Sequence, residues 1–593
     1  PMMVLAGPGS GKTSVIVERT AYMINEGGIS PSNILVVTFS RAAAKEMKER
    51  FLSFTGQQYT PVTFGTFHGV FYGILKQAYG FTAANILSDE EKFGILRELT
   101  LNYGGDLAEE GDFPEEIARE ISVVKGNKIA LEHYYSSCCP DEVFRQIYQG
   151  YREACQSRRK LDFDDMILYC YELFVQRKDI LEAWQKKFQY ILVDEFQDIN
   201  QLQYDIVRML AKPQNNLFIV GDDDQSIYHF RGARPEIMLN FTRDYPDAET
   251  VTLDVNYRCS GQILSAAMRV IGENKKRFSK KLSTPNQVGK AVQIREFQNP
   301  REEYLAVVSE LRERMEKGER LEDTAILLRT NQEAEGLVGA LMERQIPFNM
   351  KEKLPNLFQH WICRNLLAYM HFAAGEKSRK YFLEFMNRPN RYISRDALSL
   401  SPVVSFEELK EFYKDKDWMC DRITTLETHL RVLKGLAPYA AINFIRKGMG
   451  YEEYLREYAE YRKIKPEELS EILDRLTEST KGMNSLEEWE SYIEEYTENL
   501  EEQARKAEQE REGVLISTLH GVKGLEYEQV YILNVNEGSM PYRKAVLEPA
   551  IEEERRLFYV GMTRARKQLA LCYVRQQYEK KREPSRFLKE AGV

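Results

Sequence analysis

Residues 6–13, AGPGSGKT, constrain this chain more than any other part of its sequence. They follow the apolar run of residues 2–5 and precede a helical pattern that places Val17, Ala21 and Ile24 on one face. A strand, a glycine-rich loop and a helix in this order are typical of a phosphate-binding loop. The glycines let successive backbone N–H groups approach phosphate oxygens, and the start of the helix adds partial positive charge. The alternative is a chance glycine-rich turn, and the flanking pattern favours nucleotide binding.

The end of this loop carries the groups that would contact phosphate and metal. Lys12 can reach the β- and γ-phosphates, and the Thr13 hydroxyl can ligate Mg²⁺. The predicted cofactor-binding residues of the loop are Ala6, Gly7, Pro8, Gly9, Ser10, Gly11, Lys12 and Thr13. We therefore expect a nucleotide with Mg²⁺ at this position.

Composition restricts the class of protein without identifying it. A chain of 593 residues is too long for one core, so several domains are expected. No apolar run approaches the ~20 residues of a membrane span, and the N-terminus shows no secretory signal, so we expect a cytoplasmic protein without a membrane partner. The eight cysteines form no CxxC pair, which argues against a disulfide framework or a zinc site. The net charge of −9 leaves open a local basic channel for nucleic acid.

Strand and helix patterns alternate in two separate parts of the chain. Strand-like runs occur at residues 33–39, 63–68, 190–195 and 217–222, and again at 292–297, 324–328, 514–517, 530–533 and 569–573. Long apolar runs of this kind are typical of parallel sheets that are covered on both faces. Residues 80–165 and 360–510 are almost wholly helical, with a possible capping box at Ser88 and Glu91 and a helix starting at Pro114. The highly charged residues 498–512 are expected to form a solvated helix or connector. The predicted fold is two α/β units, each with a helical insertion.

Two carboxylates come at the end of a predicted buried strand. Asp194 and Glu195 follow the apolar residues 190–193, which places them at the sheet edge where ligands bind in such folds. Asp194 is suited to the Mg²⁺ shell, and Glu195 to orienting or deprotonating an attacking water. A surface acidic pair is the alternative, and the phosphate loop makes it the weaker one.

With these residues the chain resembles superfamily 1A DNA helicases of the UvrD/PcrA/Rep type. Residues 194–198, 221–228 and 256–258 resemble motifs II, III and IV; residues 38–40 and 66–68 resemble motifs Ia and Ib; residues 162–165 resemble the acidic signature before motif II; residues 518–526 and 553–565 resemble motifs V and VI; and residues 387–393 look like the family's 2B insertion. The matches run from residue 5 to beyond residue 565 in family order.

The resemblance implies four subdomains: RecA-like P-loop NTPase motor domains 1A and 2A, with helical insertions 1B and 2B. The expected bounds are 1–80 and 166–255 for 1A, 81–165 for 1B, 256–358 and 512–593 for 2A, and 359–511 for 2B. ATP and Mg²⁺ are the implied cofactors, with ATP in the cleft between 1A and 2A.

The resemblance also implies roles for single residues. The implied catalytic residues are Lys12, Asp194, Glu195, Gln225, Arg258 and Arg564, with Thr13 and Asp194 on the metal. Gln225 would sense the γ-phosphate, and Arg258 and Arg564 would act as arginine fingers. Tyr257 would stack on adenine, and Lys523 and Glu526 would lie at the nucleotide side of the cleft.

Aromatic side chains beside a cation suit a single strand, because every base offers a π-face. The expected DNA-binding residues are Phe39, Phe64, His68, Tyr228, Phe230 and Arg231. The alternative places Phe64 and Phe67 in the core and gives His68 a structural role. Phe230 stands where the family usually has Trp, Ser14 where Arg commonly stacks on adenine, and Tyr542 where some relatives have a strand-contacting His. The family's glutamine motif, which reads adenine, stands before the first strand, and because the chain begins at Pro1, inside that strand, we expect a segment upstream. After motif VI only a short tail follows in this sequence, so we expect no C-terminal nuclease domain.

The resemblance implies an ATP-dependent 3′–5′ translocase and helicase on single-stranded DNA and duplex junctions. It also implies a role in DNA repair or replication restart, with repair or replication proteins as possible partners. We expect a monomer or weak self-association. The alternative is an ATP-driven factor that remodels or recruits nucleoprotein and unwinds little alone. An RNA helicase is a weaker alternative, since no residue here rejects a 2′-hydroxyl.

Overall fold

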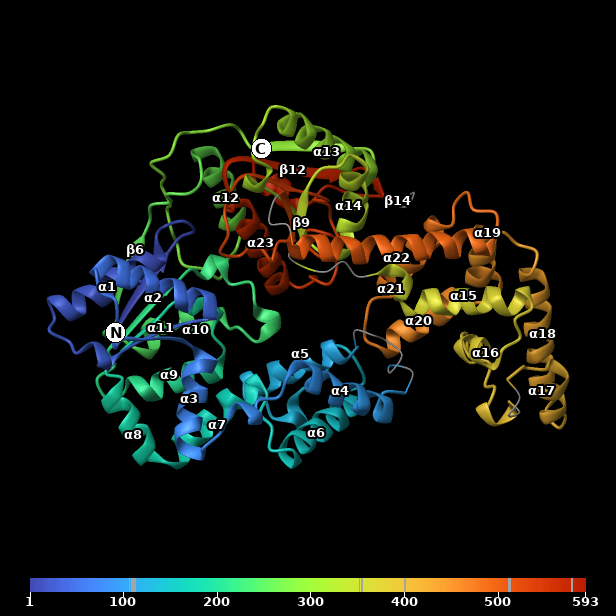
Figure 1. The fold of residues 1–593 in the computed structure, drawn as a ribbon, viewed down its shortest axis with the longest axis horizontal. Helices are drawn as coiled ribbons and strands as arrows, with labels where there is room; N and C mark the ends of the chain where they lie inside the picture. Colours follow the sequence, from blue (N-terminus) through green and yellow to red (C-terminus); the bar gives the residue numbers. More distant parts are fainter. Residues whose placement is uncertain are drawn as a thin grey trace.

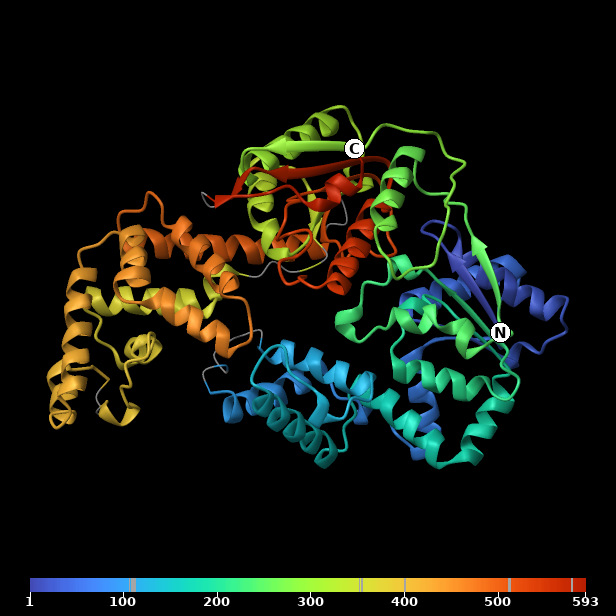
Figure 2. The same ribbon diagram turned by 180° about the vertical axis from the view of Figure 1, so that it is seen from behind.

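The computed structural model describes residues 1–593 except 106, 108–112, 351, 353–355, 399–401, 510–512, 578–579 and 593, and without the side chains of residues 231 and 503–509. Two parallel six-stranded sheets flanked by helices form its main units. They confirm the predicted fold class of two α/β domains, each with a helical insertion. The two sheet domains lie next to each other, and the second insertion extends away from them (Figures 1 and 2).

The first sheet has the strand order β3-β2-β4-β5-β1-β6. Its strands are β1 Met2–Ala6, β2 Ile34–Thr38, β3 Thr63–Thr66, β4 Tyr190–Val193, β5 Leu217–Gly221 and β6 Glu249–Leu253. Alternate residues of β1 face opposite layers: Met3 and Leu5 join one hydrophobic cluster, and Val4 and Ala6 join another. All strands of this sheet are parallel, so the loops after β1, β4 and β5 meet at one edge.

Helices cover both faces of this first sheet. Helices α1 Lys12–Asn25 and α2 Arg41–Thr55 pack on one face, and α3 Phe67–Tyr79, α7 Phe163–Gln176, α8 Lys178–Lys187, α9 Gln201–Ala211, α10 Pro235–Leu239 and α11 Phe241–Asp244 lie on the other side. Short 3₁₀ turns follow the strands at η5 (Phe196–Asp198), η6 (Asp223–Gln225) and η7 (His229–Arg231). They carry much of the candidate site.

The first insertion consists of α4 Asp89–Tyr103, α5 Phe113–Gly126 and α6 Asp141–Ser157. The predicted capping box is confirmed: Glu91 N donates to Ser88 Oγ over 3.1 Å, and Ser88 N donates to Glu91 Oε2 over 2.9 Å. Pro114 lies in the first turn of α5, as expected for a residue without a backbone donor.

The second sheet has the order β7-β12-β11-β8-β10-β9. Its strands are β7 Gln293–Phe297, β8 Thr324–Leu328, β9 Phe348–Met350, β10 Val514–Thr518, β11 Tyr527–Ile532 and β12 Ala565–Val574. The five predicted runs are confirmed as strands, whereas the three-residue edge strand β9 was not predicted. Helices α12 Gly261–Gly272, α23 Glu548–Met562 and α24 Arg586–Glu590 pack on one face, and α13 Pro300–Glu316 and α14 Ala334–Glu343 on the other. A hairpin of β13 Gln576–Gln577 and β14 Lys580–Lys581 follows β12.

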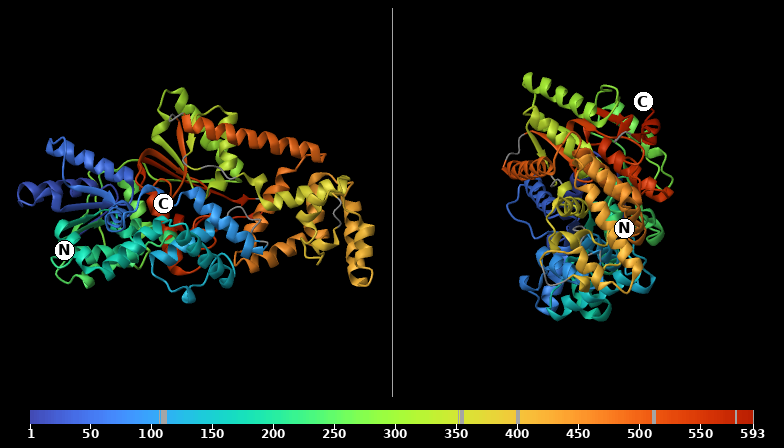
Figure 3. Two further views of the ribbon diagram at one scale, coloured as in Figure 1. Left: turned by 60° about the horizontal axis from the view of Figure 1, so that its bottom comes forward. Right: turned by 90° about the vertical axis from the view of Figure 1, so that its right-hand side faces the viewer.

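The second insertion is helical. It contains α15 Trp361–Ala374, α16 Arg379–Phe385, α17 Phe406–Phe412, α18 Asp417–Leu433, α19 Pro438–Asn443, α20 Tyr451–Tyr461, α21 Pro466–Ser479 and α22 Leu486–Gln509. The predicted stripe of Leu469, Leu473 and Leu476 is buried. The charged run predicted at residues 498–512 continues α22 as far as Gln509, and its remainder lies outside the described residues. Helix α22 leads from these helices back to the second sheet domain (Figure 3).

The two insertions share one hydrophobic cluster. It joins side chains of α4, α5 and α6 to side chains of α15 through α22. Across the described part of the chain, no helix has the length and apolar character needed to cross a membrane.

Candidate nucleotide and strand-binding site

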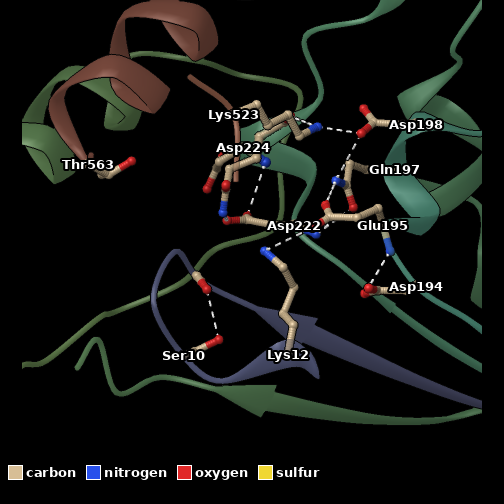
Figure 4. A network of polar contacts seen from close by, with 12 residues as sticks. Ser10, Lys12, Asp194, Glu195, Gln197, Asp198, Asp222, Asp224, Lys523 and Thr563 are labelled. Atoms are coloured by element: carbon tan, nitrogen blue, oxygen red, sulfur yellow. Dashed lines mark hydrogen bonds and ion pairs between the residues drawn. The ribbon is translucent and has the colours of Figure 1, made fainter. Parts of the chain in front are cut away.

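The phosphate loop lies between β1 and α1. Gly9 and Gly11 have φ angles of 63° and 86°, in the left-handed region that favours glycine, and α1 begins at Lys12. Ser10 Oγ donates to Gly7 O over 2.8 Å and closes the turn (Figure 4). The predicted strand, loop and helix are therefore present, with the first turn of α1 at the loop.

The two predicted carboxylates stand opposite this loop. Glu195 Oε1 lies 4.0 Å from Lys12 Nζ, and Glu195 itself adopts a left-handed φ of 50°. Glu195 N donates to Asp194 Oδ1 over 2.9 Å. Burial and the adjacent Glu195 raise the pKa of Asp194 to about 7, while Lys12 and Lys523 outweigh burial and lower the pKa of Glu195.

Gln197 connects Glu195 to the next strand. Its Nε2 donates to Glu195 Oε2 over 2.5 Å, and its Oε1 accepts a hydrogen bond from Asp222 N over 2.9 Å. The side chain is fully buried. Gln197 is not among the predicted site residues, although it lies within residues 194–198, which resemble motif II.

Gln225 carries the connection on to the second domain. Its Nε2 donates to Asp222 Oδ2 over 2.6 Å, and its Oε1 accepts from Arg564 Nη2 over 3.2 Å. Arg564 is buried, and burial together with Arg258 lowers its pKa to about 9. A continuous hydrogen-bond path thus runs from Glu195 through Gln197, Asp222 and Gln225 to Arg564.

The segment that carries Arg258 is fastened to the phosphate loop. Asn256 Nδ2 donates to Pro8 O over 2.7 Å, and Tyr257 N donates to Gly9 O over 3.0 Å. Arg258 Nε donates to Glu526 Oε2 over 2.6 Å, and Tyr257 remains 63% exposed beside the loop. The buried Asn256 is a second residue without a predicted role, although it belongs to residues 256–258, which resemble motif IV.

Lys523 lies at the seam between the two domains. It forms an ion pair with Asp198, donates to Gln225 O over 2.8 Å, and its Nζ lies 4.8 Å from the centre of the Tyr228 ring. Glu526 contacts Arg258 and Arg566. Lys523 therefore joins the Gln225 turn to the aromatic residues that follow it.

The predicted strand-contact residues lie in two groups. Phe39 and Phe64 are at the neighbouring strands β2 and β3; Phe39 is 37% exposed and Phe64 packs on Phe51, with ring centres 5.6 Å apart. His68 lies edge-on to Phe163 at 5.7 Å, and burial lowers its pKa. Phe67, which the alternative interpretation placed in the hydrophobic core, is buried.

The second group follows Gln225. Tyr228 and Phe230 have ring centres 6.0 Å apart, and Phe230 is 40% exposed and lies 5.3 Å from His520. The side chain of Arg231 lies outside the described residues.

Thr13 and Asp194 offer the donor types that Mg²⁺ prefers. A hydroxyl and a carboxylate are hard oxygen ligands. Asp194 is a buried carboxylate beside a second one, so a divalent cation would offset two like charges there. The residues present fit the predicted ion.

Two family models match this chain. The UvrD/REP helicase N-terminal domain covers residues 1–246, and the UvrD-like helicase C-terminal domain covers residues 251–576. The chain is 32% identical over 616 residues to DNA helicase II of Escherichia coli (strain K12), which covers 99% of this chain and 85% of the relative. It is 32% identical over 621 residues to ATP-dependent DNA helicase Rep of the same strain, with 100% and 92% covered. It is 30% identical over 650 residues to ATP-dependent DNA helicase PcrA of Staphylococcus aureus (strain Mu50 / ATCC 700699), with 100% and 84% covered.

These matches confirm the resemblance drawn from the motifs. They extend over both sheet domains and both insertions, and the residues brought together at the seam come from both matched halves. This chain belongs to the UvrD/REP helicase family.

Proposed function

We propose that this chain is an ATP-driven motor that moves 3′→5′ along single-stranded DNA and unwinds the duplex ahead of it. The observation that carries the proposal is the path from Glu195 to Arg564, because it joins the candidate water-orienting residue of one domain to a candidate finger of the other. Hydrolysis and domain movement would be linked by these contacts. The direction of movement rests on the family resemblance, as does a role in repair or replication restart.

Each group at the seam has a chemical task in this proposal. The phosphate loop and Lys12 bind the β- and γ-phosphates. Glu195, whose carboxylate is held by Gln197, orients or deprotonates the attacking water. Arg258 and Arg564 stabilise charge that develops on the transferred phosphoryl group. Mg²⁺, held by Thr13 and Asp194, would supply charge neutralisation on the phosphate oxygens.

The strand would be held by the exposed rings of Phe39 and Phe230 and the half-buried ring of Tyr228. Phe39, Tyr228 and Phe230 offer rings on which bases can stack, at about 1–3 kcal/mol per base. Tyr228 also contacts Lys523, which bonds to the Gln225 turn. A movement of the Gln225 turn at the nucleotide would therefore be passed to the strand through Lys523 and Tyr228.

Steady-state ATP hydrolysis tests this proposal. We expect strong stimulation by single-stranded DNA and little by RNA of equal length. Lys12→Ala should abolish hydrolysis, while Lys317→Ala, which removes an exposed lysine at the end of α13, should leave it unchanged. No stimulation by DNA, or wild-type turnover of Lys12→Ala, would overturn the assignment. Release of streptavidin from the 5′ end but not from the 3′ end of a biotinylated strand would establish the direction.

A second candidate function is the remodelling or recruitment of nucleoprotein with little unwinding by the monomer. The hydrophobic cluster that the two insertions share favours this second function, because it holds the second insertion against the first. Strand displacement by isolated monomer distinguishes the two functions: unwinding under single-turnover conditions supports the helicase, and translocation without unwinding supports the remodelling factor.

A further inference from the structure

Residues 274–283, here named the strap segment, belong in sequence to the second domain but are bonded to both. The segment lies between α12 and β7. Its first residues are held by α23: Asn274 Nδ2 donates to Glu552 O over 2.9 Å, and Arg555 Nη1 donates to Asn274 Oδ1 over 2.6 Å. Helix α23 leads directly to Arg564.

The following residues of the strap segment are held by the first domain. Arg277 forms two hydrogen bonds with Asp224, of 2.8 and 2.7 Å. Phe278 N donates to Asp223 Oδ2 over 2.8 Å, and Ser283 N donates to Asp254 O over 2.8 Å. The hydrogen bonds to α23 end at Lys276, and the hydrogen bonds to the first domain begin at Arg277.

Lys280 is the central group of this arrangement. Its Nζ lies 2.5 Å from Asp222 Oδ1, 2.6 Å from Asp223 Oδ1 and 2.9 Å from Asp224 Oδ2. These three aspartates form the one carboxylate cluster with metal-ligand spacing in the described part of the chain, and the Lys280 ammonium occupies the place of a cation. All four side chains are buried. Three carboxylates against Lys280 and Arg277 leave one net negative charge, so removing the ammonium would leave strong repulsion.

Asp222 connects the Glu195 side of the site to the Arg564 side. Its backbone N–H holds Gln197, which holds Glu195, and its Oδ2 holds Gln225, which contacts Arg564. Its other carboxylate oxygen binds Lys280. We propose that Lys280 is a positioning residue for hydrolysis: by fixing Asp222 it places both Glu195 and the Gln225–Arg564 contact.

The inference rests on the proposed function, and Lys280→Ala tests it with Lys281→Ala as control. Lys281 is the adjacent, exposed lysine. A positioning role predicts that Lys280→Ala binds a fluorescent ATP analogue and single-stranded DNA about as tightly as wild type, while DNA-stimulated kcat falls about tenfold or more, since small misplacements are costly at a reacting centre. Lys281→Ala should keep wild-type kcat. DNA-stimulated kcat of Lys280→Ala within about twofold of wild type would overturn the inference.

Chemical rescue separates positioning from general packing. Propylammonium replaces the atoms that Lys280→Ala removes, so it should raise kcat of this variant without changing wild type, whereas the bulkier tert-butylammonium should not. Loss of ATP and DNA affinity in step with kcat, without rescue, would show a merely structural role and overturn the inference. Absence of DNA stimulation in wild type would instead remove the proposed function.

A charge-matched double variant covers the case in which Lys280→Ala is too unstable to assay. Asp223→Asn with Lys280→Met removes one carboxylate together with the ammonium and should recover the wild-type melting temperature. Its DNA-stimulated kcat should stay low, because Asp222 still lacks its cation. Recovery of both properties would overturn the positioning role.

Discussion

The residues at the seam between the two domains differ in how well their roles could be predicted from the sequence. The spacing of residues 6–13 and the position of Asp194 and Glu195 after a buried strand indicated phosphate and metal chemistry directly. Gln197 and Asn256 were not assigned roles, because their hydrogen bonds to Asp222 N and Pro8 O join loops that follow different strands of the sheet. Hydrogen bonds of this kind depend on how strands are ordered in the sheet, which no local pattern contains.

Glu303, on α13, is a buried carboxylate outside the candidate site. Its Oε1 accepts from Asn534 N over 3.0 Å. Burial, together with the nearby Glu333, raises its pKa from the usual 4.5 to about 8. The folded state therefore binds this proton more tightly than the unfolded state does.

The sign of the effect on stability follows from this difference. Between pH 4.5 and about 8 the unfolded chain has lost the proton that Glu303 keeps in the folded chain. The contribution of Glu303 to the free energy of unfolding therefore falls as pH rises. Glu303→Gln keeps an acceptor for Asn534 and removes the titration. We expect similar melting temperatures for wild type and Glu303→Gln near pH 4.5, and a higher one for the variant at pH 8. Glu313→Gln, an exposed change on α13, should show no such divergence, and parallel profiles for all three proteins would contradict the assignment.

At the scale of elements, local signals predicted the helical segments and most strands but missed two edge strands, β6 and β9. The capping box at Ser88 involves residues three apart, so the sequence alone was enough. Strand β9 has three residues and pairs only with β10, so its formation depends on a neighbour more than 160 residues away.

The acidic signature at residues 162–165 joins the first insertion to the motor domain. Asp162 caps α7, and the buried Lys125 of α5 lies 2.9 Å from Asp162 and 2.7 Å from Asp165. Burial would lower the pKa of Lys125, but these two carboxylates raise it above its usual value. The ion pairs hold α5 against α7.

Lys125→Met should loosen this joint strongly. Removing one partner of a buried ion pair costs about 3–5 kcal/mol, because the remaining charges are buried without compensation. Hydrogen exchange should therefore speed up in α5 and α7, with the second sheet domain unaffected. Arg119→Ala, an exposed change on α5, should alter exchange little. Equal protection in Lys125→Met and wild type would rule out this role for the joint.

At the scale of the whole molecule, the two insertions meet through the turn after α20. Arg462 Nη2 lies 3.0 Å from Glu116 Oε2, its guanidinium lies 4.8 Å from the Phe113 ring centre, and it also donates to Cys138 O. Lys463 Nζ lies 2.6 Å from Asp141 Oδ1. No periodicity within α20 indicated this contact, because its partners lie in the other insertion.

Arg462→Ala should release the second insertion from the first. The variant loses a buried cation and its packing on Phe113, so the distance between the insertions should increase and vary more. Energy transfer between dyes on α6 and α18 should fall relative to wild type. Arg456→Ala is the matched control, since Arg456 is exposed on α20 and pairs with Glu453 of the same helix. Unchanged transfer in Arg462→Ala would mean that the shared hydrophobic cluster holds the insertions without it.

Because of the strap segment, the first domain includes contacts from residues that follow it in the sequence. A chain that ended after β6 would contain Asp222, Asp223 and Asp224 but neither Lys280 nor Arg277. The three acids would then lack both cations that form ion pairs with them, and the hydrophobic core that Phe278 joins would lack that ring. The two family matches part between residues 246 and 251, so the aspartates lie in one matched region and the cations that pair with them lie in the other. The first domain is complete only when its neighbour's chain has been made as far as Ser283.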